Sequence, residues 1–113
     1  VPGLGDGHTP ASLNPAAYRL LRSGDYPGGR PFDGLTYTDD LSGMKAITDT
    51  MSVPQAVTAA IGAGADQALW SSGTDLIPAI DAVQHAVNSG AIDPAVIADA
   101  AFRVQLQLVR AGL

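Results

Sequence analysis

Apolar residues recur at helical spacing along much of the chain. The clearest stretch covers residues 75–89, where Ile77, Ile80 and Val83 share one face of the expected helix. Such spacing is typical of amphipathic helices with one buried face. We expect five helices, over residues 16–22, 43–47, 55–63, 75–89 and 95–110.

Local start and stop signals support these boundaries. Three of the helices follow a capping residue and a proline, which together reduce the number of free N–H groups in the first helical turn. The three pairs are Asn14 with Pro15, Ser52 with Pro54, and Asp93 with Pro94. Gly24 and Gly90 follow two expected helix ends, where glycine readily adopts the left-handed conformation.

Two short β-prone runs separate the helices, over residues 35–38 and 67–70. Strands that alternate with helices pair in parallel through βαβ crossovers, so the pattern predicts an α/β protein. A parallel sheet needs cover on both faces, and two strands alone leave exposed edges. We therefore interpret the chain as the tail of a larger α/β unit, such as a (β/α)8 barrel of about 250 residues.

Composition narrows the choice of partners. Of the 113 residues, 46% are hydrophobic and only 15% are charged, which is low for a free-standing surface and suggests contact with further protein. The 11 acidic and 6 basic side chains give a net charge of −5, which argues against a nucleic-acid partner. No apolar run is long enough to span a bilayer, and cysteine is absent, which excludes disulfides and thiolate chemistry.

Asp39 and Asp40 are the most informative polar residues, because they directly follow the first predicted strand. Ligands and catalytic groups of parallel α/β proteins lie at the carboxyl ends of strands, so the pair indicates a site. Taken alone, however, the pattern favours an exposed turn aspartate that caps the following helix.

Several segments together resemble the N-terminal barrel domain of glycoside hydrolase family 3, on the branch of bacterial β-N-acetylhexosaminidases. The most specific feature is the order Phe-Asp-Gly, then Thr-Asp-Asp-Leu, then Met-Lys-Ala. The matching segments are Pro10-Ala11-Ser12-Leu13-Asn14-Pro15, Phe32-Asp33-Gly34-Leu35, Thr38-Asp39-Asp40-Leu41-Ser42, Met44-Lys45-Ala46-Ile47, Ala60 to Asp66, and Ala101-Phe102-Arg103-Val104. Gly43 departs from the family's usual direct Ser-Met step and predicts a slightly longer turn.

The resemblance implies a role for the acidic pair and a place for the chain in the fold. Asp39 would be the catalytic nucleophile at the end of the seventh barrel strand, and Asp40 would help to shape the turn. A short, stiff carboxylate suits attack on an anomeric carbon to form a glycosyl ester. Residues 1–113 would be a partial barrel domain, the C-terminal portion with about strands 7 and 8, truncated at the N-terminus and without a second domain.

The implied activity is hydrolysis of O-glycosidic bonds by a retaining exo-glycosidase that needs no metal or organic cofactor. Its implied substrate is a carbohydrate, the terminal N-acetylglucosamine of cell-wall glycans. The family's acid–base loop, its Lys-His pair and its sugar-hydroxyl ligands belong to earlier strands, so we expect the chain to be inactive without the N-terminal part of the barrel. Two alternatives stay open: another family 3 glycosidase, such as a β-glucosidase, and a non-catalytic barrel remnant.

Other residues are weaker candidates. Trp70 could stack on a sugar or be buried between barrel and helix, and Met44 could line the pocket or belong to the core. Asp6 and His8 superficially resemble the acid–base dyad, but the segment after them matches the region that follows the sixth strand, so we expect a loop. His85 falls on a helix face, and neither histidine has a partner at metal-ligand spacing. Three hydroxyl residues in the loop after the second strand could line the site: Ser71, Ser72 and Thr74.

Overall fold

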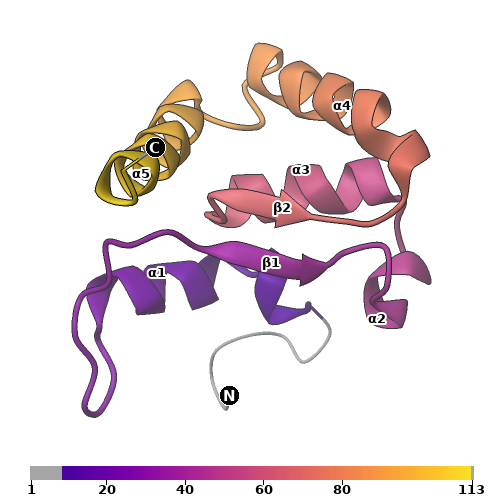
Figure 1. Cartoon of the computed structure of the whole chain (residues 1–113). Coiled ribbons are helices and arrows are strands. Elements are labelled where there is room, and N and C mark those ends of the chain that lie inside the picture. The colour runs from indigo at the N-terminus through magenta and orange to yellow at the C-terminus, as the bar shows by residue number, and fades with distance from the viewer. Residues whose placement is uncertain (1–8, 113) are drawn as a thin grey trace.

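A computed structural model describes residues 9–112 of the chain (Figure 1). It contains two strands and five α-helices, with short 3-10 helices before α1 and α4. In chain order the elements are η1 (Ala11–Leu13), α1 (Pro15–Ser23), β1 (Tyr37–Asp40), α2 (Lys45–Thr48), α3 (Val53–Ala63), β2 (Gln67–Leu69), η2 (Gly73–Asp75), α4 (Leu76–Asn88) and α5 (Pro94–Arg110). The predicted α/β class and the order of the elements are confirmed.

β1 and β2 form a parallel two-stranded sheet, as the sequence predicts. Tyr37 pairs with Gln67 and Asp40 pairs with Leu69, so β1 has one residue more than β2 between these pairs. Such an irregularity is a local bulge that changes how the side chains leave the strand.

The first strand begins two residues later than predicted, so the predicted range 35–38 is wrong in its boundaries. The reason lies in Thr36, whose carbonyl accepts hydrogen bonds from the N–H groups of Asp66 and Gln67. The Thr36 N–H donates in turn to the Asp66 carboxylate, so this residue contacts the approach to β2 instead of continuing the ladder. Asp39 and Asp40 therefore lie inside the strand and not after it.

The helix boundaries follow their capping residues. The Asn14 side chain accepts from the N–H of Ala16 at 3.0 Å at the start of α1, and Asp93 does the same for Ala95 at 2.9 Å in α5. α3 begins at Val53, two residues before the predicted range, because Ser52 and its partner at the third helical position form a reciprocal capping box.

The short second helix starts two residues later than the predicted range 43–47. The N–H groups of Ser42 and Gly43 both donate to the Asp40 side chain, at 2.9 and 3.2 Å. These bonds hold the residues in a turn, so α2 cannot begin before Lys45. Whether this turn is longer than in other family members, as Gly43 predicts, stays a prediction.

The hydrophobic core lies between the sheet and the helices on one of its sides. α3 contacts β2, α1, α4 and α5, and Figure 1 shows it behind β2. Thr38 is buried on this side of β1, whereas Tyr37 is 70% exposed on the other. One face of the sheet is therefore covered by helices and the opposite face is open. The core cluster comprises Leu13, Leu41, Ile47, Ala56, Val57, Ala60, Ala65 and Ala79.

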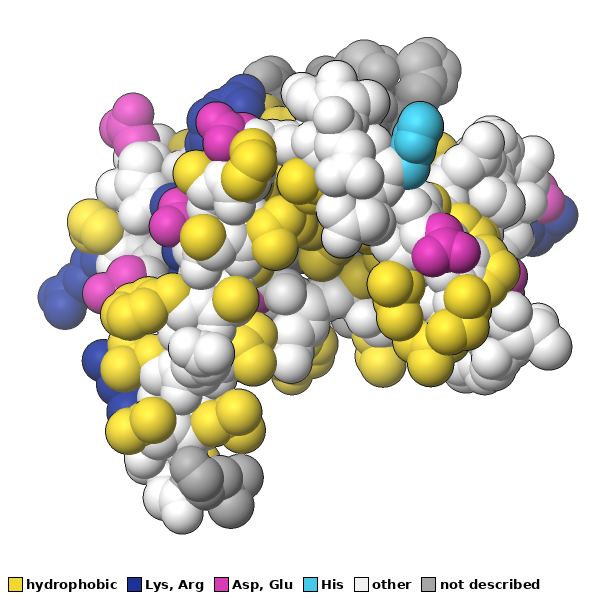
Figure 2. Space-filling view, turned by 90° about the horizontal axis from the view of Figure 1, so that it is seen from above, with side chains coloured by type: hydrophobic (Ala, Val, Ile, Leu, Met, Phe, Trp, Pro, Cys, Tyr) yellow, Lys and Arg dark blue, Asp and Glu magenta, His cyan; other side chains and the backbone are white. Residues whose placement is uncertain are grey.

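Large hydrophobic side chains remain exposed outside this core. Figure 2 shows hydrophobic side chains over the upper face of the molecule, where α4 and α5 lie. The exposed residues of these two helices are Leu76, Ile77, Ile80, Phe102, Leu108 and Val109. Monomeric proteins rarely expose so many large apolar residues without a partner surface.

Candidate functional site

The two adjacent aspartates have different surroundings at the end of β1. Asp39 is exposed, as is Tyr37 two residues earlier, whereas Thr38 between them is buried against the helices. This alternation places the Asp39 side chain on the open face of the sheet. Asp40 is partly buried and belongs to the turn that follows.

Asp40 is held by a dense set of hydrogen-bond donors. Its Oδ1 accepts from the N–H of Ser42 at 2.9 Å, from the N–H of Gly43 at 3.2 Å and from the Ser42 hydroxyl at 2.5 Å. The hydrogen bond from the Ser42 side chain, with a smaller effect of the nearby Ser71, lowers the pKa of Asp40 from 3.8 to about 2. Bonds to the charged form favour that form, so Asp40 is a fixed anion with a structural role in the turn.

Asp39 has no comparable partners. In the part of the chain that the structure describes, no residue donates a hydrogen bond to its carboxylate. It does not cap α2, because the N-cap of that helix is Met44, and no side-chain capping bond is present there. The capping alternative for Asp39 is therefore not the one that the structure adopts. An exposed, unpaired carboxylate at a strand end is available to a ligand.

The other sequence-predicted candidates lie around the carboxyl ends of the strands. Met44 and Trp70 are both partly buried and pack against the core cluster. Trp70 also lines a hollow of about 270 Å³ with Ser71 and Ser72, so it combines burial with access to the strand-end loops. Contact of Met44 or Trp70 with a sugar stays a prediction.

The open face of the sheet carries a second hollow, of about 370 Å³. It is lined by Tyr37, Gln67, Ala68 and Leu69. Gln67 and Leu69 are exposed on β2 as Tyr37 and Asp39 are on β1. The open face is thus a contiguous surface built from both strands, with the Asp39 carboxylate at its carboxyl end.

The opposite end of the sheet holds an ion cluster that sequence reasoning missed. The Asp66 side chain is fully buried just before β2 and accepts from Arg22 Nη2 and Arg103 Nε, each at 2.9 Å. Arg22 comes from α1 and also donates to the carbonyls of Phe32 and Gly34. The sequence does contain a signal for this cluster, namely a charged residue in an otherwise apolar run and arginines on two of the predicted helices. The pairing was missed because the three residues lie far apart along the chain.

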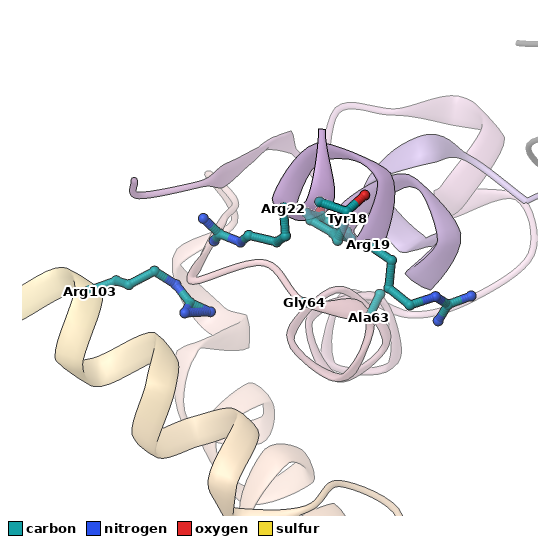
Figure 3. A pocket seen from close by; sticks show the side chains of 7 residues that line it. Tyr18, Arg19, Arg22, Ala63, Gly64 and Arg103 are labelled. Atoms are coloured by element: carbon teal, nitrogen blue, oxygen red, sulfur yellow. The ribbon is translucent and has the colours of Figure 1, made fainter. Parts of the chain in front are cut away.

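A hollow of about 530 Å³ lies beside this ion cluster (Figure 3). Figure 3 shows Arg22 of α1 and Arg103 of α5 extending toward one another, while Arg19 points away from both. Tyr18 lines the same hollow, and its hydroxyl donates to the carbonyl of Ser12 at 2.8 Å. Burial, and then the Asp66 charge, raise the pKa of Tyr18, so the phenol stays neutral. The arginines are already paired, which makes this end of the sheet structural.

The remaining candidates do not join the site. His85 is exposed on α4, away from the strand ends. Asp6 and His8 lie outside the described residues. Within residues 9–112 no group of three or more metal-ligating side chains comes together, and no helix there is long and apolar enough to cross a membrane.

These features describe a mixed α/β unit with a free carboxylate at the end of a parallel strand. The chain belongs to glycosyl hydrolase family 3, since residues 2–106 match the N-terminal domain of that family. The resemblance inferred from the sequence motifs is thereby confirmed.

Relatives and solved structures agree with this assignment. The chain is 42% identical to the beta-hexosaminidase LpqI of Mycobacterium tuberculosis over 104 residues, which cover 92% of the chain but only 26% of LpqI. A family 3 glycosyl hydrolase from Mycobacterium smegmatis superposes with a TM-score of 0.86 at 47% identity, over 91% of this chain and 32% of that one. A family 3 β-N-acetylglucosaminidase from Paenibacillus gives 0.81 at 30% identity, over 96% and 20%. These relatives are glycoside hydrolases, and the chain spans about a quarter of the curated relatives' length.

Proposed function

We propose that the chain is the C-terminal portion of a (β/α)8 barrel and carries the nucleophile of a retaining exo-β-N-acetylhexosaminidase. β1 and β2 would be the seventh and eighth strands, and residues 1–113 a partial barrel domain. The observation that carries the proposal is the Asp39 carboxylate, which is exposed and unpaired at the end of β1 on the open face of the sheet. In a barrel, the carboxyl ends of the strands form the catalytic face.

The chemistry follows from an ionised carboxylate in that position. An Asp39 oxygen attacks the anomeric carbon, while an acid–base group from an earlier part of the barrel protonates the departing glycosidic oxygen. The product is a glycosyl ester on Asp39, and the aglycone leaves as an alcohol. Water, deprotonated by the same acid–base group, then attacks the anomeric carbon and releases Asp39 as a carboxylate. The anomeric configuration is retained because two inversions occur.

The substrate proposal is terminal N-acetylglucosamine on a cell-wall glycan. It is supported by the names of the similar proteins, a beta-hexosaminidase and a β-N-acetylglucosaminidase. The same names favour this specificity over a β-glucosidase. Trp70, which is partly buried and lines the hollow at the end of β2, would contact the sugar with its ring edge or face.

The barrel proposal also accounts for the uncovered surfaces. Tyr37 and Leu69, which are 70% and 51% exposed on the open face, would point into the barrel interior. Phe102 and Val109 on α5 would be covered by elements next to the eighth strand. The chain therefore needs the N-terminal part of the barrel to complete its fold, and it should hydrolyse no glycoside in isolation. The opposite result, a well-protected monomer in hydrogen exchange and size-exclusion chromatography, would contradict the barrel proposal and favour an independent binding module.

The experiment that tests the function uses a chimeric barrel, in which residues 2–106 replace the matching segment of the Mycobacterium smegmatis family 3 hydrolase. We expect the chimeric barrel to release the chromophore from an aryl N-acetylglucosaminide. Asp39→Asn should lower kcat on the order of 10³-fold or more, because a catalytic group that cannot form the covalent intermediate removes the reaction path. Asp99→Asn is the matched control, since Asp99 is an exposed aspartate on α5. Retention of activity by Asp39→Asn would contradict the assignment.

A further inference from the structure

Three hydroxyl side chains surround the backbone of Asp39 and Asp40, and we call Thr38, Ser42 and Ser71 the hydroxyl cluster. Thr38 lies within β1, Ser42 in the turn after β1, and Ser71 in the loop after β2. Neither Thr38 nor Ser42 was singled out by the sequence motifs as more than a neighbour of the acidic pair.

The Thr38 side chain links β1 to β2 at the bulge, where the backbone hydrogen bonds between the strands are interrupted. Between the pairs that Tyr37 and Asp40 form with β2, the extra residue removes one direct ladder bond. The Thr38 hydroxyl takes its place: it accepts from the N–H of Leu69 at 3.0 Å and donates to the carbonyl of Asp39 at 2.7 Å. Thr38 is only 2% exposed, so these bonds are shielded from water. The Asp39 peptide is thus tied to β2 through a side chain.

Ser42 ties the turn after β1 to the loop after β2. Its Oγ lies 2.5 Å from Asp40 Oδ1 and 3.0 Å from the Ser71 Oγ, and it accepts from the Ser71 N–H at 3.1 Å. A serine has one proton to donate, and the Asp40 carboxylate can only accept. The Ser42 proton therefore goes to Asp40, and the Ser71 hydroxyl donates to Ser42. The donor and the acceptor of each hydrogen bond in this network are therefore defined.

Both contacts act on the backbone that directly follows the Asp39 side chain. Thr38 fixes the Asp39 carbonyl, and the anchored Asp40 carboxylate fixes the turn after it. The Asp39 carboxylate, in contrast, is free of partners in residues 9–112. With no donor to the carboxylate itself, the contacts that hold Asp39 in this part of the chain act through its backbone.

We propose that the hydroxyl cluster positions the Asp39 carboxylate for attack, with Thr38, Ser42 and Ser71 as positioning residues. This inference rests on the proposed function, because it assigns a role only if Asp39 is the nucleophile. A misplacement of about 1 Å at a reacting group can lower a rate about 10²-fold, so loss of one tie has a measurable effect.

The test compares hydroxyl deletions in the chimeric barrel with variants that keep the hydroxyl. Ser42→Ala and Thr38→Val should each lower kcat about tenfold or more and leave KM nearly unchanged, the pattern of an interaction made in the transition state. Ser42→Thr and Thr38→Ser restore a hydroxyl and should recover most of kcat. Recovery by these variants distinguishes a positioning role from a general loss of packing.

Matched controls remove the same atoms elsewhere. Ser89→Ala deletes a hydroxyl that donates to a carbonyl at the end of α4, and Thr58→Val deletes one that donates within α3. Both should leave kcat unchanged. If Thr38→Val lowers kcat no more than Thr58→Val at equal melting temperature, the hydroxyl cluster has no positioning role.

A second readout separates this inference from the proposed function. A fluorinated glycosyl fluoride of N-acetylglucosamine reports attack by the nucleophile alone, because fluoride leaves without acid catalysis. Mass spectrometry should find the label on Asp39, with a rate at least about tenfold lower in Ser42→Ala, as the misplacement argument requires. Labelling of Asp39 at an unchanged rate would refute the positioning role while the nucleophile assignment stands. Labelling of a different residue would refute both.

Discussion

Replacement of the buried Asp66 carboxylate should be among the most destabilising single changes in the chain. Its side chain is 0% exposed and accepts hydrogen bonds from Arg22, Arg103 and Thr36. In Asp66→Asn the side chain keeps its size but loses its charge. One of its two acceptor positions also becomes an NH₂ group, which would face an arginine donor.

The expected loss of unfolding free energy follows from the two arginine charges that remain without their carboxylate partner. Removal of one partner from a buried ion pair costs about 3–5 kcal/mol, because the remaining charge stays desolvated. Arg22 and Arg103 are 23% and 25% exposed, so water can partly replace the lost carboxylate. We therefore expect about 3 kcal/mol for Asp66→Asn, at the low end of that range. Arg103→Met should cost less, because Asp66 retains Arg22 and Thr36.

Urea and thermal unfolding of the chimeric barrel measure this prediction. At about 2 °C for each kcal/mol in a large domain, Asp66→Asn should lower Tm by about 6 °C. Asp99→Asn, the same chemical change on the exposed side of α5, should be nearly neutral. The double variant Asp66→Asn/Arg103→Met should cost at least about 0.5 kcal/mol less than the sum of the single variants, as expected for groups in contact. An Asp66→Asn barrel as stable as the Asp99→Asn control would refute the reasoning.

Two further predictions concern acid stability and a tight turn. The pKa of Asp40 is lowered from 3.8 to about 2, so its contribution to stability is complete above about pH 4 and is lost as the pH falls through about 2. Melting curves between these pH values should show that loss of stability, and the loss should be smaller in Ser42→Ala. If Tm falls with pH equally in both proteins, the Ser42 hydrogen bond does not cause the low pKa of Asp40. Gly24 has φ 69°, and an added Cβ would clash with the backbone of Arg30. Gly24→Ala should therefore cost more than about 1–2 kcal/mol, the left-handed penalty alone. Gly28→Ala is its control, because Gly28 has φ 76° and open space around it; equal losses of Tm would exclude the clash.

The helices were predictable because their signals are local. Asn14 and Asp93 cap the helices that follow them in the sequence, and Gly24 adopts the left-handed conformation where α1 ends. Each of these residues acts on N–H or C=O groups within a few positions along the chain. Parallel pairing was predictable for a related reason, since a helix between two strands leaves few other connections.

The misplaced strand boundary and the missed ion cluster have one common cause. Asp66 lies 44 residues from Arg22 and 37 from Arg103, and it contacts Thr36 across 30 residues. No local pattern encodes those contacts, and the same contacts decide where β1 begins. The sequence identified Asp66 only as part of a family motif, without the reason for a carboxylate at that position.

The difference between Asp39 and Asp40 needed both kinds of information. The sequence presents two identical neighbouring residues, and only the family resemblance separates their roles. The structure separates them physically: three donors hold one oxygen of Asp40, whereas Asp39 is exposed on the open face. A carboxylate with these bonds is a poor nucleophile, because one of its oxygens is already engaged and its pKa is low. The turn that makes Asp40 unsuitable for attack is also the turn that fixes the backbone beside Asp39. In the proposed mechanism, Asp40 thus supports attack by Asp39 because it is itself unreactive and anchors the turn.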